Sequence, residues 1–142
     1  MKHLVVFAAA MAFSASAAAR SIEVCPELPG YSNLAWSYQE GPDFDVYYAR
    51  EPGSEATAFG VYLGNHPSFH SDGAVRSGKG RVAGRRVAWY HLDATEGEQP
   101  WGRQTLSMLD RKNGYVAHIW VMADTEQQLQ DRLSVLERMV IR

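Results

Sequence analysis

The stretch QTLSMLDRKNGYVAHIWVMADTEQQLQDRLSVLERMV, residues 104–140, decides the fold of this chain. Its Asn113-Gly114 pair stands between two apolar runs, 104–110 and 115–122, which is the strongest short signal for a β-hairpin. In the second run, both alternating sets of positions are largely apolar. That pattern is typical of a strand covered on both faces. The stretch therefore predicts a buried hairpin followed by an element that covers it.

The covering element is predicted to be an amphipathic helix. One apolar stripe recurs at positions i, i+4, i+7 and i+11, formed by Leu129, Leu133, Leu136 and Val140. Asp124 is the expected N-cap, and Gln127 three residues later completes a capping-box pattern. A helix that lies on a membrane is richer in Lys and Arg on its polar face, so we expect this one to pack on the sheet.

Further short strands are predicted upstream. Residues 33–39 and 44–50 are aromatic-rich and flank the turn sequence Glu-Gly-Pro-Asp, which indicates an antiparallel hairpin, and 57–63 indicates a third strand. The polar run 64–79 is the longest expected loop, and loops of this length often carry function. The run RVAGRRVAWYHLD, residues 81–93, is either one strand with a glycine bulge or a tight hairpin.

These elements predict an α+β fold, namely an antiparallel sheet of about six strands with one C-terminal amphipathic helix packed on one face. Residues 20–142 suffice for a single domain with its own core. Cys25 is the only cysteine of the chain, so no internal disulfide can form and packing must stabilise the core. We expect Cys25 to be a lone thiol in a loosely held N-terminal segment.

Residues 1–19 have the pattern of a secretory signal peptide. Lys2 is followed by an apolar run and then by Ala17-Ala18-Ala19, a small-residue cleavage site. The apolar run is shorter than the roughly 20 residues that a bilayer-spanning helix needs, so a stable membrane anchor is not expected. The prediction is an exported domain, residues 20–142, that is periplasmic or secreted after cleavage near Ala19.

Charge is polarised along the chain, although the net charge is only -2. Residues 20–72 contain eight acidic residues against two arginines, and residues 73–118 contain eight basic residues against four acids. We expect the two blocks to face each other on adjacent strands, where opposite charges pair. The alternative is a basic surface that steers a partner. Export excludes nucleic acid as that partner and favours an envelope or secreted protein with an acidic surface.

A partner-binding surface is predicted at the long loop and the basic run after it. Aromatic and arginine side chains carry much of the energy of protein interfaces, and we expect Phe69 and Trp101 to be exposed anchors. The predicted surface consists of Asn65, His66, Phe69, His70, Asp72, Arg81, Arg85, Arg86 and Trp101.

Histidines support an alternative function, the binding of a small ligand or a metal. His66, His70 and Asp72 are candidate ligands for zinc or copper, because imidazole and carboxylate suit these metals. Trp89 and His91 alternate on one strand, as do His118 and Trp120 on another. If the strands are near neighbours, these four side chains form one surface for a ligand.

Catalytic signatures are missing from the sequence. It lacks the G-x-S-x-G, S-x-x-K and H-E-x-x-H patterns and paired cysteines, and it implies no cofactor. The favoured function is therefore a non-catalytic exported binding domain, an inhibitor, immunity or accessory protein that engages another protein. An envelope hydrolase is the third hypothesis, after the ligand-binding or metal-binding domain.

Overall fold

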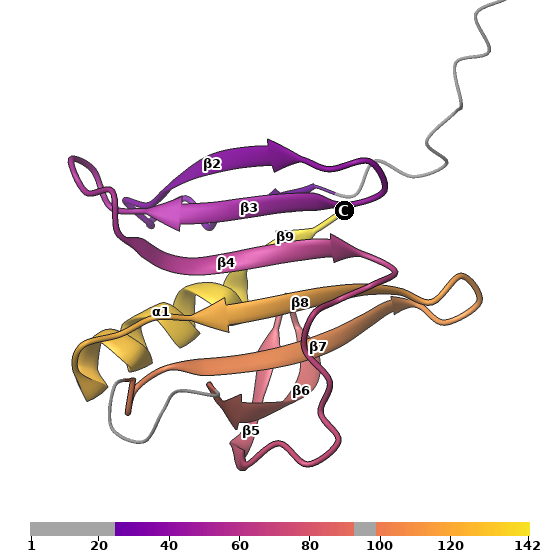
Figure 1. Cartoon of the computed structure of the whole chain (residues 1–142). Helices are drawn as coiled ribbons and strands as arrows, with labels where there is room; N and C mark the ends of the chain where they lie inside the picture. Colours follow the sequence, from indigo (N-terminus) through magenta and orange to yellow (C-terminus); the bar gives the residue numbers. More distant parts are fainter. Residues whose placement is uncertain (1–24, 93–98) are drawn as a thin grey trace, which may run out of the picture.

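Seven antiparallel strands form the main sheet of the computed structural model, which describes residues 25–92 and 99–142 (Figure 1). The strand order is β2-β3-β4-β8-β7-β6-β5. The strands are β2 (Ala35–Glu40), β3 (Asp45–Arg50), β4 (Thr57–Gly64), β5 (Arg76–Val82), β6 (Arg85–His91), β7 (Arg103–Asp110) and β8 (Tyr115–Val121). Helix α1 (Glu126–Arg138) lies across one face of this sheet. The predicted α+β class is confirmed, and the predicted signal peptide lies outside the described residues.

The predicted hairpins are present. β2 pairs with β3, and β7 pairs with β8 around Asn113-Gly114. The open question at residues 81–93 is resolved in favour of two strands, because β5 and β6 turn at Ala83 and Gly84. These two residues have φ of 50° and 75°, the left-handed region that a two-residue hairpin turn requires. The loop before β5 is shorter than predicted, since β5 already begins at Arg76.

Helix α1 begins one residue later than the sequence predicted. Thr125 is the N-cap, and its hydroxyl accepts a hydrogen bond from the backbone N–H of Gln128 at 3.1 Å. The Gln128 side chain in turn accepts from the backbone N–H of Asp124 at 2.9 Å. The cap thus lies one residue after the predicted pair Asp124 and Gln127, and the return bond reaches the N–H of Asp124 rather than that of the N-cap Thr125.

Thr125→Ala should lower the free energy of unfolding by about 1 kcal/mol, because the Gln128 amide loses its cap. Asp124→Ala is the matched control and should cost less, since the Asp124 side chain provides only charge near the helix N-terminus. Urea unfolding of both variants measures the difference. A larger loss of stability for Asp124→Ala than for Thr125→Ala would contradict the assignment of Thr125 as the N-cap.

The core lies between the sheet and α1. β4 and β8 contribute its centre, and Leu129 and Leu136 cover it from the helix. The fully buried strand residues include Phe59, Val61, Leu63, Ala117, Ile119 and Val121. Val140, predicted as the last residue of the helical stripe, instead lies beyond the helix in β9 (Val140–Ile141), and Met139 is buried in its place.

The β5–β6 turn also ends the helix. The N–H of Ala83 donates to the carbonyl of Leu136 at 2.9 Å, and the N–H of Gly84 donates to that of Glu137 at 3.2 Å. The last carbonyls of a helix have no partner within the helix, so these bonds from a distant turn satisfy two of them. They also fix the β5–β6 hairpin to the body of the domain.

A second small sheet joins the chain ends of the described region. β1 (Pro26–Glu27) pairs with β9 (Val140–Ile141), and the backbone groups of Cys25 and Arg142 bond each other in both directions at 2.6 and 3.2 Å. Cys25 is exposed, and its backbone is tethered rather than loosely held as predicted.

Candidate partner-binding surface

The charged strand residues of the two blocks lie mostly at opposite edges of the main sheet, whereas Asp72 lies in the loop before β5 and Arg103 in β7. β2 and β3 form one edge, with exposed Glu40 and Asp43 at their turn, and β5 and β6 form the other. Five cationic residues of the basic edge are exposed: Arg76, Lys79, Arg81, Arg85 and Arg86. The prediction that the blocks pair on adjacent strands is wrong, because β4, β8 and β7 separate them.

Four of these five cations share the face of the sheet opposite α1, which we call the open face. Directly paired residues of neighbouring strands lie on one face. Tyr90 pairs with Gln104 and Gln104 with Trp120, which places all three opposite the helix. Along β5 and β6 the same face carries Arg76, Lys79, Arg81 and Arg86. We call these four residues the basic hairpin face.

Arg81 lies directly opposite Arg86 in the β5–β6 ladder. Like charges in directly opposed positions destabilise a sheet, so this pair is unfavourable in the isolated domain. The ion pairs found within the described residues join Arg132 to Glu51 and Arg142 to Glu27, and neither involves the basic hairpin face. An anionic group from outside would therefore relieve a repulsion as well as form new contacts.

Arg85 does not belong to this face, although the sequence grouped it with Arg81 and Arg86. It pairs with the buried Val82, so its side chain starts on the helix face. Its guanidinium Nη1 donates to the carbonyl of Met108 in β7 at 3.0 Å. This hydrogen bond joins β6 to β7 at a point where the two strands are not paired, because only Tyr90 and His91 of β6 pair with β7. Arg85 thus supports the sheet.

The loop between β4 and β5, residues 65–75, crosses the open face in front of β8 and β7 (Figure 1). Asn65 begins it and donates its side-chain amide to the carbonyl of Asn113, and the backbone N–H of His66 donates to the Tyr62 hydroxyl at 3.0 Å. His66, His70 and Asp72 are exposed, as a recognition loop requires.

Phe69 is not the exposed anchor that the sequence predicted. Only 5% of its surface is exposed, and its ring stacks on His118 at a centroid distance of 5.5 Å and lies 5.6 Å from Tyr90. The one aromatic side chain of this polar loop holds the loop on the sheet. Trp101 is also partly buried and packs against the core. An exposed apolar side chain on the open face is instead Met108, at 44% exposure, whereas Val75, at 67%, lies opposite His91 and so on the helix side.

His118 lies at the centre of the open face with 6% of its surface exposed. Its Nε2 is 3.3 Å from Oε1 of Gln104, and the Gln104 amide donates to the His91 carbonyl at 3.4 Å. Burial lowers the pKa of His118 from 6.5 to about 4, so the ring is neutral at pH 7. A neutral imidazole that donates Nε2–H to an amide oxygen is a structural group here.

The four residues predicted as a ligand surface lie on two different faces. β7 separates β6 from β8, and Trp89 and His91 point to the helix side while His118 and Trp120 lie on the open face. Trp89 is buried in the core. Tyr90, which the sequence reasoning passed over, shares the open face with His118. The prediction of one shared tryptophan–histidine surface is wrong, because alternation along each strand leaves the relative parity of two strands undetermined.

No group of three or more His, Cys, Asp or Glu side chains is placed to hold a metal ion within residues 25–92 and 99–142. The predicted metal candidates His66, His70 and Asp72 are exposed loop residues. In the same part of the chain, no helix is both long and apolar enough to cross a bilayer.

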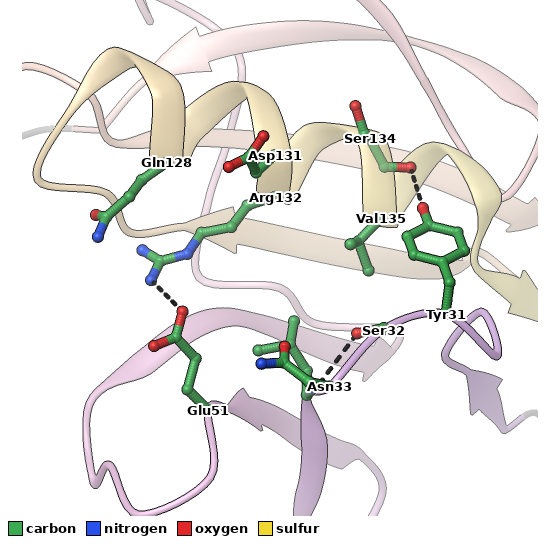
Figure 2. Close-up of a pocket in the computed structure, with 10 residues that line it drawn as sticks. Tyr31, Ser32, Asn33, Glu51, Gln128, Asp131, Arg132, Ser134 and Val135 are labelled. Carbon is green, nitrogen blue, oxygen red and sulfur yellow. Dashed lines mark hydrogen bonds and ion pairs between the residues drawn. The ribbon is translucent and has the colours of Figure 1, made fainter.

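A cavity of about 360 Å³ lies between α1 and the segment before β2 (Figure 2). Arg132 reaches across it to Glu51 at 3.6 Å, and its Nη1 also donates to the carbonyl of Met122. At the other end, the Tyr31 hydroxyl donates to the carbonyl of Ser134 at 3.4 Å. The Arg132 guanidinium is thus already paired with groups of the protein, and the residues around the cavity connect the helix to the sheet.

Comparisons of the chain with protein-family models, with curated proteins and with solved structures find no match.

Arg76 and Lys79 belong to the basic part of the sequence but not to the predicted surface. For Lys79, the sequence does contain an indication: Lys79 and Arg81 are two residues apart, which places both side chains on one face of a strand. With Arg86 opposite Arg81, this spacing defines a positively charged surface of one strand pair.

Proposed function

We propose that this protein is an exported, non-catalytic binding domain that engages an acidic partner protein through its basic hairpin face. The role is that of an inhibitor, immunity or accessory protein in the periplasm or outside the cell, after cleavage near Ala19. The observation that carries the proposal is the placement of Arg81 directly opposite Arg86, flanked by Lys79 and Arg76 on one exposed face.

Charge separation supports this choice of partner. The basic edge faces away from the acidic strands of the same molecule, so the protein's field attracts an acidic surface at β5 and β6. Exposed Met108, on the open face of β7, adds apolar area, which an interface needs in its centre. The exposed loop residues Asn65, His66, His70 and Asp72 border the same face and provide polar contacts.

The charge reversal Arg81→Glu/Arg86→Glu should slow association with the partner at least tenfold at low salt, with much less effect at high salt. The matched control is Arg111→Glu/Lys112→Glu, which makes the same change in net charge at the exposed β7–β8 turn. Each full chain is immobilised and exposed to an envelope extract, and the captured protein is identified by mass spectrometry. Association rates are then measured by surface plasmon resonance at two ionic strengths.

We expect one protein to be captured by the wild-type chain and by the control, and to be lost with Arg81→Glu/Arg86→Glu. Equal association rates for the two double variants would overturn the proposal, because the effect would then follow net charge rather than this surface. If instead the chain binds zinc or a small molecule, and binds it equally well in both double variants, the ligand-binding alternative is favoured.

A further inference from the structure

We propose that the partner's contact segment is an extended acidic strand that pairs with the outer side of β5 and extends the main sheet. This inference rests on the proposed function and specifies how the basic hairpin face recognises its partner. It commits to one chemistry, a segment with carboxylates at alternate positions and apolar residues between them.

The first observation is the edge itself. β5 ends the strand order, and no strand of the described residues pairs with its outer side. It is seven residues long, and five of these residues are exposed. An exposed edge of this length is a template for pairing with another chain, and peptide recognition by strand addition uses such edges.

The ladder shows which backbone groups face outward. In a hairpin with a two-residue turn, the closing pair, here Val82 and Arg85, exchanges hydrogen bonds, and bonded and non-bonded pairs alternate from there. Gly80 and Val87 are the next bonded pair. Lys79 and Arg81 stand at the non-bonded positions, so their N–H and C=O groups point away from β6 towards an incoming strand.

The same two residues supply the charge. The side chains of Lys79 and Arg81 lie on the open face, two positions apart, beside Arg86. Residues of an added strand that stand opposite Lys79 and Arg81 lie on this face as well, where carboxylates pair with the cations. Gly80 between them and Gly78 before them present no side chain to the other face of the added strand. That face accommodates apolar residues.

A second copy of this chain is a poorer occupant. Its acidic edge strand β2 has the sequence AWSYQE, with a single carboxylate at the last position. This strand cannot place carboxylates opposite both Lys79 and Arg81. Self-association is nevertheless read out in the test below.

The test separates backbone pairing from charge. Lys79→Pro removes the outward N–H of Lys79 and leaves the bonds between β5 and β6 intact, and proline is tolerated on an edge strand when its nitrogen faces outward. Lys79→Thr is the matched control, because it removes the same charge and keeps the N–H. The probe is a fluorescent peptide of alternating Glu and Val, seven residues long, whose binding to the full chain is measured by anisotropy.

We expect the wild-type chain to bind the peptide, Lys79→Thr to weaken binding two- to threefold, and Lys79→Pro to weaken it at least tenfold with an unchanged melting temperature. A peptide of the same sequence with alternate backbone nitrogens methylated on its pairing side should not bind. Equal binding by Lys79→Pro and Lys79→Thr would overturn strand addition.

A second measurement does not depend on how Lys79→Pro folds. Amide hydrogen exchange of the wild-type chain should show new protection of the Lys79 and Arg81 amides when the peptide binds, and absence of this protection would overturn the inference. If only Arg81→Glu/Arg86→Glu lowers binding, the proposed function stands and strand addition fails. Chain dimers that dissociate with salt and block the peptide would instead identify a second copy as the occupant.

Discussion

Gly60→Ala is expected to lower the free energy of unfolding by about 2–3 kcal/mol, the cost of forcing a side chain into a filled site. Gly60 in β4 pairs directly with Trp120 in β8. A Cβ atom at residue 60 would lie 2.0 Å from Cζ2 and 2.2 Å from Cε2 of the Trp120 ring, so the ring must leave its position. Trp120 would then lose its edge contact with Tyr48 and its contact with His118.

Gly78→Ala is the matched control, because Gly78 is also a strand glycine of the same sheet and no described residue other than its chain neighbours comes within 4 Å of its Cβ position. It should change stability by less than about 0.5 kcal/mol. In a double-mutant cycle, Gly60→Ala should cost little once Trp120→Ala has removed the ring. Equal costs for Gly60→Ala in both backgrounds, measured by urea unfolding, would show that the ring does not depend on this glycine.

Glycine 60 shows what local sequence reasoning can predict and what it cannot. The strand 57–63 was predicted from its composition and is present as β4, but nothing near Gly60 in the sequence indicates that an indole covers it. The ring comes from residue 120, and the pairing of β4 with β8 joins segments far apart in the chain. Hairpins such as the one at Asn113-Gly114 are predictable because the turn and both strands are neighbours in sequence.

The strand order explains why the charge prediction failed. An acidic block followed by a basic block suggested adjacent strands, since consecutive elements are usually neighbours. Here β8 inserts next to β4, and the basic hairpin is carried to the far edge. The basic residues themselves were predicted, but the isolation of the basic hairpin face from the acidic strands follows only from the long-range pairing.

The parity of the strands could not be read from the sequence either. Val87, Trp89 and His91 alternate on one face of β6, and Val116, His118 and Trp120 alternate on one face of β8, as predicted. The register across β7 places these two sets on opposite sides of the sheet. A shift of one residue in the pairing of two strands moves every side chain of one strand to the other face, and so decides whether the two sets share a surface. For Phe69, the polar composition of the loop indicated exposure, whereas the single aromatic residue serves to fix the loop.

Because His118 is buried as a neutral ring, the free energy of unfolding of the domain should decrease at acidic pH. Its folded-state pKa of about 4 lies below the unfolded value of 6.5. Between these values the unfolded chain binds a proton that the folded chain excludes, so the free energy of unfolding is largest above pH 6.5 and falls as the pH drops towards 4. For this group alone, lowering the pH from 7 to 5 removes about 2 kcal/mol. Its neighbours Gln104, Phe69 and Tyr62 carry no charge in this range, so they offer the imidazolium no compensation.

His118→Phe keeps an aromatic ring beside Phe69 and removes the titrating group. It should be less stable than the wild type at pH 7, because Oε1 of Gln104 loses its partner, but its stability should fall by about 2 kcal/mol less between pH 7 and pH 5. His70→Gln, which removes an exposed histidine, is the control and keeps the wild-type dependence. Urea unfolding of the three proteins at the two pH values gives one difference for each. A parallel decline in all three proteins would contradict this prediction, because His118 would then take up its second proton, at Nδ1, as readily in the folded domain as in the unfolded chain.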